Sequence, residues 1–294
     1  MIRGYKMESI LELKGIEKRF EGFALGPIDL VIPGGSIMGL IGKNGAGKTT
    51  TMRLILNLLK PDSGSISIFG MDHIKDEPKV KEDIAVVFDE CLFPPILDQR
   101  ALGKILAGSY KNWDDTLYRE YLRKFQLDDN PSRLIKDYSR GMKVKLSLAA
   151  ALAHRPRLLI LDEATAGLDP VVRDEILEVF LNFISDEDHA ILMSSHITED
   201  LEKIADYICY IHKGQIVLQD NKDDILENYG RAVFPKTELE KIDRSDLVSI
   251  RQSSFGCEAL VSDRHGFAAK YPGLMVEKAG LEDIMLFTGK GEKL

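Results

Sequence analysis

The 294-residue sequence predicts an α/β fold with a largely parallel core sheet, a small antiparallel β-layer, an inserted helical subdomain and a small C-terminal α/β extension. Three observations predict it. Short β-rich runs bounded by Gly and Pro come first, apolar runs typical of buried strands return later, and a long middle segment has helical spacing. We expect one domain over residues 1–230, with the helical subdomain at about 89–154, and an accessory region over residues 231–294.

The first strands are predicted at residues 10–13 and 28–32, and a Pro-Gly-Gly turn follows the second of them. Residues 37–41 are almost continuously apolar, as expected for a strand buried on both faces. This strand leads directly into a glycine-rich loop and a helix predicted over about 48–59. The order of strand, loop and helix places the loop at the carboxyl end of a buried strand.

Further strands are predicted at 66–69 and 84–88, after a Pro-Asp-Ser-Gly turn. The spacing then becomes helical, with Leu117, Tyr121 and Phe125 on one face of a helix. This change predicts the inserted helical subdomain.

Buried strands return at 158–161 and 191–194, with a helix predicted at 175–184 between them. A hairpin is expected where 208–212 and 215–218 flank Lys213-Gly214. Strands that alternate with helices pair in parallel, so the core sheet is expected to be largely parallel.

The composition narrows the classes of partner. A net charge of −8 and a pI near 5.4 disfavour a nucleic-acid binder, because phosphate neutralisation requires a basic surface, and we expect no direct contact with nucleic acid. The three cysteines lack metal-ligand spacing and are expected to be reduced, as in the cytosol. The longest apolar run, 146–153, is far shorter than the roughly 20 residues of a membrane span, so any membrane connection is expected through a partner.

The loop after strand 37–41 satisfies the phosphate-loop pattern G-x-x-x-x-G-K-[ST]. Its residues are Gly42, Lys43, Asn44, Gly45, Ala46, Gly47, Lys48 and Thr49, and we add Thr50, the next residue, to the phosphate-binding set. Glycines allow backbone N–H groups to converge on phosphate oxygens, Lys48 supplies charge, and the Thr49 hydroxyl ligates Mg²⁺. A glycine turn that only caps a helix would not explain Lys48-Thr49. The sequence therefore predicts that the chain binds ATP with Mg²⁺.

Strand 158–161 ends in two adjacent carboxylates, Asp162 and Glu163. Such a pair is often a helix cap, but downstream of a phosphate loop it suits magnesium binding by Asp162 and general-base chemistry by Glu163. Strand 191–194 leads to His196 on the same sheet edge, where its imidazole can contact the γ-phosphate, with a structural histidine as the alternative.

Two more motifs complete an ordered set: Tyr138-Ser139-Arg140-Gly141-Met142 opens a helix, and Ala166-Gly167-Leu168-Asp169 follows the acidic pair. Along the chain the five motifs are the phosphate loop and residues 138–142, 158–163, 166–169 and 195–196. Their order resembles that of ABC ATPases. The resemblance covers Ile10 to about Tyr229. The chain looks most like the ATP-binding subunits of ABC-2 type bacterial exporters. The resemblance implies a P-loop NTPase fold with a RecA-like core.

The resemblance also implies roles for residues outside the phosphate loop. Phe20 matches the aromatic residue that stacks on adenine, although a core phenylalanine would look the same. Ser139 and Gly141 match the residues that bind the γ-phosphate of ATP held by a second subunit. Asp169 matches an aspartate that communicates across this head-to-tail interface, and His196 the switch histidine. The implied dimer is a homodimer or a related heterodimer.

The chain departs from the family pattern after strand 84–88, where Asp89 replaces the usual glutamine. Its carboxylate can accept from water or reach Mg²⁺, but it adds negative charge near bound phosphate. Tyr138, Arg140 and Met142 also depart from the usual signature.

The resemblance implies an ATPase motor that couples hydrolysis to transport by a separate polytopic membrane permease, bound through residues 89–109 on the cytoplasmic face of the cell membrane, and it favours export. A soluble ABC protein acting on the ribosome or nucleic acid is the alternative, but such proteins usually carry two cassettes or a long coiled coil. A metabolite kinase would explain the phosphate loop but not Ser139-Arg140-Gly141. For residues 231–294 we expect a regulatory or dimer-supporting role.

Overall fold

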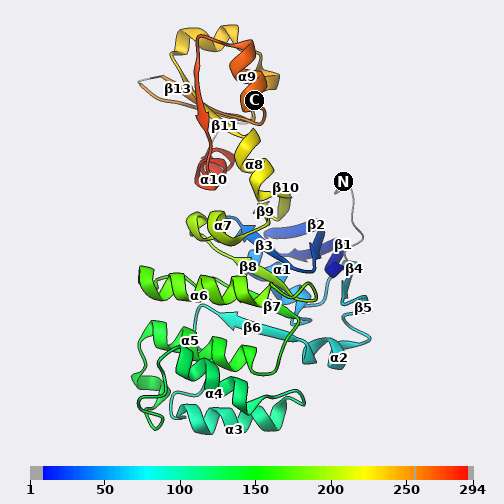
Figure 1. Ribbon diagram of the computed structural model, residues 1–294. Coiled ribbons are helices and arrows are strands. Elements are labelled where there is room, and N and C mark those ends of the chain that lie inside the picture. The colour runs from blue at the N-terminus through cyan, green and yellow to red at the C-terminus, as the bar shows by residue number, and fades with distance from the viewer. Residues whose placement is uncertain (1–8, 255, 291–294) are drawn as a thin grey trace.

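Three sheets carry the fold of residues 9–254 and 256–290, which are the residues described by this computed structural model (Figure 1). The strand orders are β2-β1-β4-β5, β10-β9-β3-β8-β7-β6 and β12-β13-β11-β14. The predicted α/β architecture, with its antiparallel layer, helical insertion and C-terminal extension, is confirmed. Residues 1–8 of the predicted first domain and 291–294 of the accessory region lie outside the described residues.

The antiparallel layer is built around strand β1 (Ser9–Phe20). It pairs with β2 (Phe23–Pro33) on one side and β4 (Ser63–Ile68) on the other, and β5 (Met71–Asp72) completes the edge. β1 and β2 are longer than predicted because their polar residues alternate with buried apolar ones, so that one face of the layer joins the core.

The core sheet is parallel through its centre. β3 (Ser36–Ile41), buried at every residue, lies between β8 (Ala190–Ser194) and β9 (Tyr207–His212). β7 (Leu158–Asp162) joins β8 to β6 (Ile84–Phe88). All of these strands run in the same direction, so their carboxyl ends meet at one edge, where ligands bind in open α/β sheets.

An antiparallel strand, β10 (Gln215–Asn221), closes the other edge of this sheet as the predicted hairpin with β9. Lys213 and Gly214 in its turn both have positive φ, of 49° and 81°, which suits the right-handed twist of the paired strands.

The helices beside the core sheet differ from the predictions at their ends. α1 (Lys48–Ile55) is shorter than expected, because Asn57 adopts a left-handed conformation with φ 54°. α6 (Pro170–Phe183) begins five residues earlier than expected, where Asp169 caps it and Pro170 occupies its first turn. The shorter α7 (Thr198–Ile204) follows β8, and α2 (Glu77–Glu82) precedes β6.

The helical subdomain contains α3 (Gln99–Ser109), α4 (Asp115–Lys124), the short η1 (Ile135–Asp137) and α5 (Arg140–Leu152). Side chains of Asp98, Asp114 and Ser139 cap α3, α4 and α5 by accepting from backbone N–H groups. Figure 1 shows these helices at one end of the molecule, with the C-terminal sheet at the opposite end.

The C-terminal extension begins after α8 (Lys222–Asn228). Its sheet consists of β11 (Gly230–Phe234), β12 (Ser249–Gln252), β13 (Cys257–Val261) and β14 (Met275–Lys278). The remaining elements are η2 (Lys236–Lys241), η3 (Arg244–Asp246), α9 (Arg264–Lys270) and α10 (Leu281–Lys290).

Helix α10 ties this extension to the domain that contains the core sheet. It packs against α7 and β9, and Ile284 and Phe287 are buried in the same hydrophobic cluster as the strands of the core sheet. Within the described part of the chain, no helix combines the length and the apolar character needed to cross a membrane.

Candidate nucleotide-binding site

The carboxyl edge of the core sheet opens into a cavity of about 1270 Å³. The phosphate loop, the ends of β6 and β7 and the segment after β8 meet around it. Its lining residues are Phe23, Gly42, Lys43, Asn44, Gly45, Gly47, Lys48, Thr49, Thr50, Arg53, Phe88, Asp89, Asp162, Glu163, Ala166, His196 and Met285.

The phosphate loop is shaped by glycine at Gly47, which has φ 122° and leaves no room for a side chain. A Cβ at this position would lie 2.6 Å from Leu25 Cδ1. No side chain among the described residues caps the N-terminus of α1, so its first N–H groups are available to an anion. The loop therefore presents backbone donors at the positive end of a helix.

Lys48 is the central cation of the cavity. Its side chain is only 6% exposed, and its Nζ donates to the Gly42 carbonyl over 2.8 Å and lies 3.6 Å from Glu163 Oε1. A buried ammonium group needs such oxygen partners. The geometry fixes Lys48 beside both the loop and the acidic pair.

Ala46 differs from its neighbours in the loop. It is buried in the core and is not among the described residues that line the cavity. Its N–H donates to the Lys43 carbonyl over 3.0 Å, and its carbonyl accepts from Gly214 N over 2.9 Å. Ala46 thus anchors the loop to the β9–β10 turn.

Asp162 is held by hydroxyl groups from two other segments. Thr49 Oγ1 donates to its Oδ2 over 3.2 Å, and Ser194 Oγ donates to its Oδ1 over 2.6 Å. The sheet register explains this convergence, because Phe88, Asp162 and Ser194 lie side by side at the ends of three neighbouring strands. These two hydrogen bonds fix the orientation of the Asp162 carboxylate.

Glu163 has an unusual backbone, with φ 54°, and its N–H donates to Ser194 Oγ over 3.0 Å. A left-handed conformation is uncommon for a residue other than glycine and occurs often at functional sites. The Glu163 carboxylate accepts from the ring of His196, whose side chain is otherwise exposed, and it faces Lys48 on its other side. The three predicted residues thus form one connected group.

The oxygen donors of this edge suit magnesium. Thr49 and Asp162 are hard oxygen ligands, and they already lie within hydrogen-bond distance of each other. Among the described residues no group of three or more His, Cys, Asp or Glu can hold a metal by itself. That arrangement fits Mg²⁺, which proteins usually bind through one or two side chains together with substrate phosphates.

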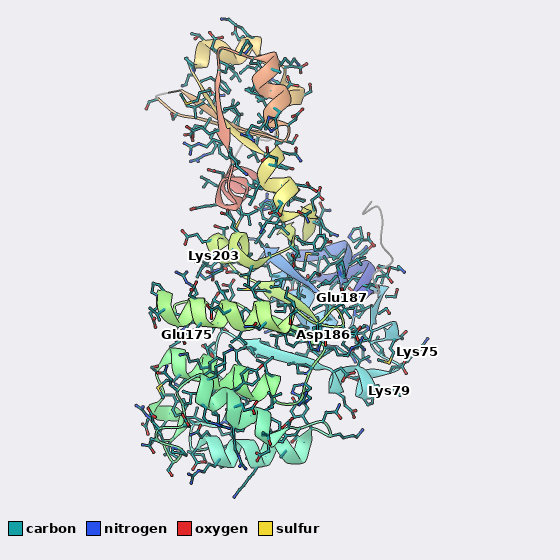
Figure 2. All side chains as sticks on the ribbon, viewed as in Figure 1. Lys75, Lys79, Glu175, Asp186, Glu187 and Lys203 are labelled. Atoms are coloured by element: carbon teal, nitrogen blue, oxygen red, sulfur yellow. The ribbon has the colours of Figure 1, made fainter. Side chains whose placement is uncertain are left out.

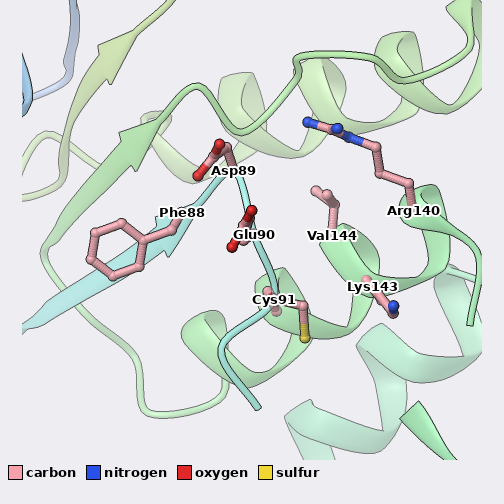
Figure 3. A pocket seen from close by; sticks show the side chains of 8 residues that line it. Phe88, Asp89, Glu90, Cys91, Arg140, Lys143 and Val144 are labelled. Carbon is pink, nitrogen blue, oxygen red and sulfur yellow. The ribbon is translucent and has the colours of Figure 1, made fainter. Parts of the chain in front are cut away.

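Asp89 follows β6 and lines two cavities. One is the cavity of the phosphate loop, and the other, of about 380 Å³, also contains Glu90 and reaches Arg140 and Lys143 on α5 (Figure 3). Asp89 therefore lies between the phosphate loop and the helix that begins after Ser139.

Ser139, Gly141 and Asp169 are not among the described residues that line the phosphate-loop cavity. Ser139 caps α5 by accepting from Met142 N over 3.2 Å, and Asp169 caps α6 by accepting from Val172 N over 3.1 Å. Gly141 faces Val172, whose Cγ1 would lie 3.4 Å from a Cβ at the glycine. Their assignment to ATP on a second subunit stays a prediction.

Phe20 is 44% exposed, and its ring centroid lies 6.2 Å from that of Phe23. Of these two rings, Phe23 lines the cavity and Phe20 does not. Phe23 was not predicted from the sequence, although it lies in the same turn of the β1–β2 hairpin. Two further lining residues were not predicted either: Arg53, one turn into α1, and Met285, which reaches the cavity from α10.

The helix after His196 carries a buried carboxylate, Asp200. Burial raises the pKa of Asp200, because it penalises the charged form, and Arg173 on α6 opposes the shift with its Nε 3.7 Å from Oδ1. The ion pair between Arg173 and Asp200 therefore links α6 to α7.

Known proteins resemble this chain. A family model described as ABC transporter matches residues 25–166. The ABC transporter ATP-binding protein YtrB of Bacillus subtilis (strain 168) is 33% identical over 221 residues, 75% of this chain and 75% of that protein. The bacitracin transport ATP-binding protein BcrA of Enterococcus faecalis is 32% identical over 251 residues, 85% of this chain and 80% of that protein. A solved structure of an ATP-binding subunit of an ABC transporter has 28% identity and a TM-score of 0.68, covering 74% of this chain and 92% of that one.

Proposed function

The chain belongs to the ABC transporter family as an ATP-binding subunit, the ATP-hydrolysing motor of a transporter, and from this we propose a role for each residue of its nucleotide cavity. The observation that carries the proposal is the convergence of the phosphate loop, Asp162, Glu163 and His196 on one cavity. Their spacing suits a triphosphate with an attacking water beyond its γ-phosphate.

In the proposed mechanism the phosphate loop binds the β- and γ-phosphates, and Lys48 balances their charge. Glu163 orients the attacking water and accepts its proton. His196 holds the Glu163 carboxylate in position and contacts the γ-phosphate. Phe20 and Phe23 form the aromatic surface for the adenine ring.

Thr49 and Asp162 are the proposed protein ligands of Mg²⁺, and Asp89, which lines the same cavity, is proposed to contact the ion or a water bound to it. The ion supplies charge neutralisation across the transferred phosphoryl group when it is bound. Ser194 keeps the Asp162 carboxylate turned toward Thr49.

We further propose a head-to-tail dimer in which Ser139 and Gly141 contact ATP bound by the other subunit. In one chain these residues lie at the N-terminus of the 13-residue α5, a favourable position for an anion, yet outside the phosphate-loop cavity. A second copy would bring them to it. Asp169, at the start of α6, would lie at the same interface.

Replacing Asp89 by Gln is expected to raise the rate of ATP hydrolysis at saturating Mg²⁺ about fivefold and to raise the Mg²⁺ concentration required, because a carboxylate ligand is lost. The amide removes a negative charge near the phosphates, a repulsion of roughly 1 kcal/mol for unit charges about 4 Å apart in water, which applies because Asp89 is exposed. Phosphate release measured across a Mg²⁺ titration tests this. Glu90→Gln is the matched control, because Glu90 is the adjacent carboxylate and does not line the nucleotide cavity (Figure 3). Unchanged turnover and magnesium dependence would disprove the role of Asp89.

The proposed permease-binding surface lies between β6 and α3. Leu92 and Ile96 are 70% and 76% exposed there, and Ile105 on α3 is also exposed. Apolar side chains grouped on one surface are typical of an interaction site. Bound to a permease, the chain would lie on the cytoplasmic face of the membrane. The names of its relatives, which include a Nod factor export ATP-binding protein, favour export.

Ile96→Glu is expected to reduce co-purification with the permease at least about tenfold, because it places a charge in an apolar contact. Affinity capture from detergent-solubilised membranes, with the polytopic partner quantified by mass spectrometry, measures this. Ile74→Glu, in the turn after β5, is the control, since Ile74 is also an exposed isoleucine. Melting temperatures establish that both variants fold. Recovery of ribosomes in place of a membrane protein would support the nucleic-acid alternative.

A further inference from the structure

Helix α10 reaches the nucleotide site from the far end of the chain. Lys43 Nζ, in the phosphate loop, donates to the carbonyl of Gly289 over 3.1 Å, across 246 positions of sequence. Met285, one turn earlier on α10, lines the nucleotide cavity itself. The accessory region therefore forms part of the wall of the ATP site.

The body of α10 is firmly attached to the ATPase core. Ile284 and Phe287 are buried, Tyr210 donates its hydroxyl to the Met285 carbonyl over 3.3 Å, and Leu281 N donates to Glu202 on α7 over 2.8 Å. Gly289 lies in the last turn of the helix. Movement of that turn would leave the buried contacts of α10 intact.

The bond from Lys43 to Gly289 joins a cation to the end of a helix. Carbonyls in the last turn of an α-helix lack intrahelical partners and carry the negative end of its dipole, so an ammonium group stabilises them. The acceptor is nevertheless a neutral carbonyl. A phosphate oxygen carries charge, and a charge-assisted bond to it is roughly twice as strong.

The Lys43 side chain has space to exchange one hydrogen-bond partner for another. Lys43 lines both the nucleotide cavity and a neighbouring cavity of about 410 Å³ between the His196 segment and α10. The side chain is exposed, and a lysine carries its ammonium group on a stem of four rotatable carbons. It can turn from Gly289 toward the phosphates without displacing buried groups.

We propose that Lys43 changes partner when ATP binds, so that ATP releases the last turn of α10 from the phosphate loop. The inference rests on the proposed binding of ATP by this loop. Coupling between two contacts is reciprocal, so strengthening the bond from Lys43 to Gly289 weakens ATP binding by the same factor. The C-terminal extension thereby regulates the affinity of the site for nucleotide.

Amide hydrogen exchange of the full chain tests the release. With saturating ATP and Mg²⁺, exchange in residues 286–290 is expected to increase in the wild-type protein. In Lys43→Met, which retains Lys48, nucleotide at saturating concentration is expected to leave this exchange unchanged. Exchange that ATP does not alter in the wild-type protein would overturn the inference.

Gly289→Ala tests the reciprocal effect without altering the phosphate loop. The new Cβ would lie 2.4 Å from Lys43 Cε and Nζ, so it moves the flexible end of that side chain away from the carbonyl. ATP affinity is expected to rise about threefold, the value of one exposed hydrogen bond. Gly108→Ala, in α3, is the control, because no atom lies within 4 Å of its added Cβ.

Titration calorimetry with a non-hydrolysable ATP analogue measures both variants. Unchanged or weaker binding by Gly289→Ala would contradict competition for Lys43. A wild-type protein that binds no ATP would instead disprove the proposed function, so the two failures are distinguishable.

Discussion

Replacing Glu163 by Gln is expected to lower the rate of ATP hydrolysis by about 10²- to 10⁴-fold, the usual contribution of a positioned general base. The amide preserves the shape of the side chain but cannot accept the proton of the attacking water. Lys48 and the phosphate loop remain in place, so ATP stays bound. Because hydrolysis would normally open the dimer, the variant is expected to accumulate as an ATP-bound dimer.

Phosphate release and light scattering with ATP present measure the two effects separately. Glu187→Gln provides the control, since Glu187 is an exposed glutamate outside the nucleotide cavity (Figure 2). It should hydrolyse ATP at the wild-type rate. A Glu163→Gln protein that does the same would exclude Glu163 as the base.

Lys48→Ala is expected to weaken ATP binding about 100-fold, because it removes a charge-assisted contact to the phosphates. The substitution also leaves Glu163 without its nearby ammonium partner, so the electrostatic balance of the cavity becomes more negative. Bound triphosphate adds further negative charge to that site. Both effects lower the affinity for ATP.

Equilibrium binding of a fluorescent ATP analogue measures the loss. Lys75→Ala is the matched control, because Lys75 is an exposed lysine in the turn after β5, with its Nζ 3.7 Å from Asp72 Oδ2 and outside the nucleotide cavity (Figure 2). Its affinity is expected to equal that of the wild type. If Lys48→Ala also bound normally, the assignment of the phosphate loop would fail.

Much of the site could be predicted because its residues follow strands. Asp162 ends β7, Asp89 comes directly after β6, and His196 lies two residues after β8, so neighbouring parallel strands bring these positions together. The buried apolar runs that mark such strands are readable from the sequence. The contiguous phosphate-loop pattern identified the residues of the loop itself.

Met285 and Gly289 could not be predicted in the same way. Met285 reaches the cavity, and Gly289 reaches Lys43 of the phosphate loop, only because α10 packs against α7 and β9, a tertiary arrangement that local periodicity does not encode. The early start of α6 was different, since Asp169-Pro170 is a recognisable N-terminal signal that the apolar spacing obscured.

The shared core of α10 and the ATPase also bears on how the protein is made. Ile284 and Phe287 fill a cluster that contains residues of β3, β7 and β8, so part of the core-sheet interior is closed by a helix that is synthesised after all of these strands. Domains usually fold during synthesis as soon as their own residues are available. Here the nascent chain is expected to expose apolar surface until α10 has been synthesised, and such surface is a target for chaperones.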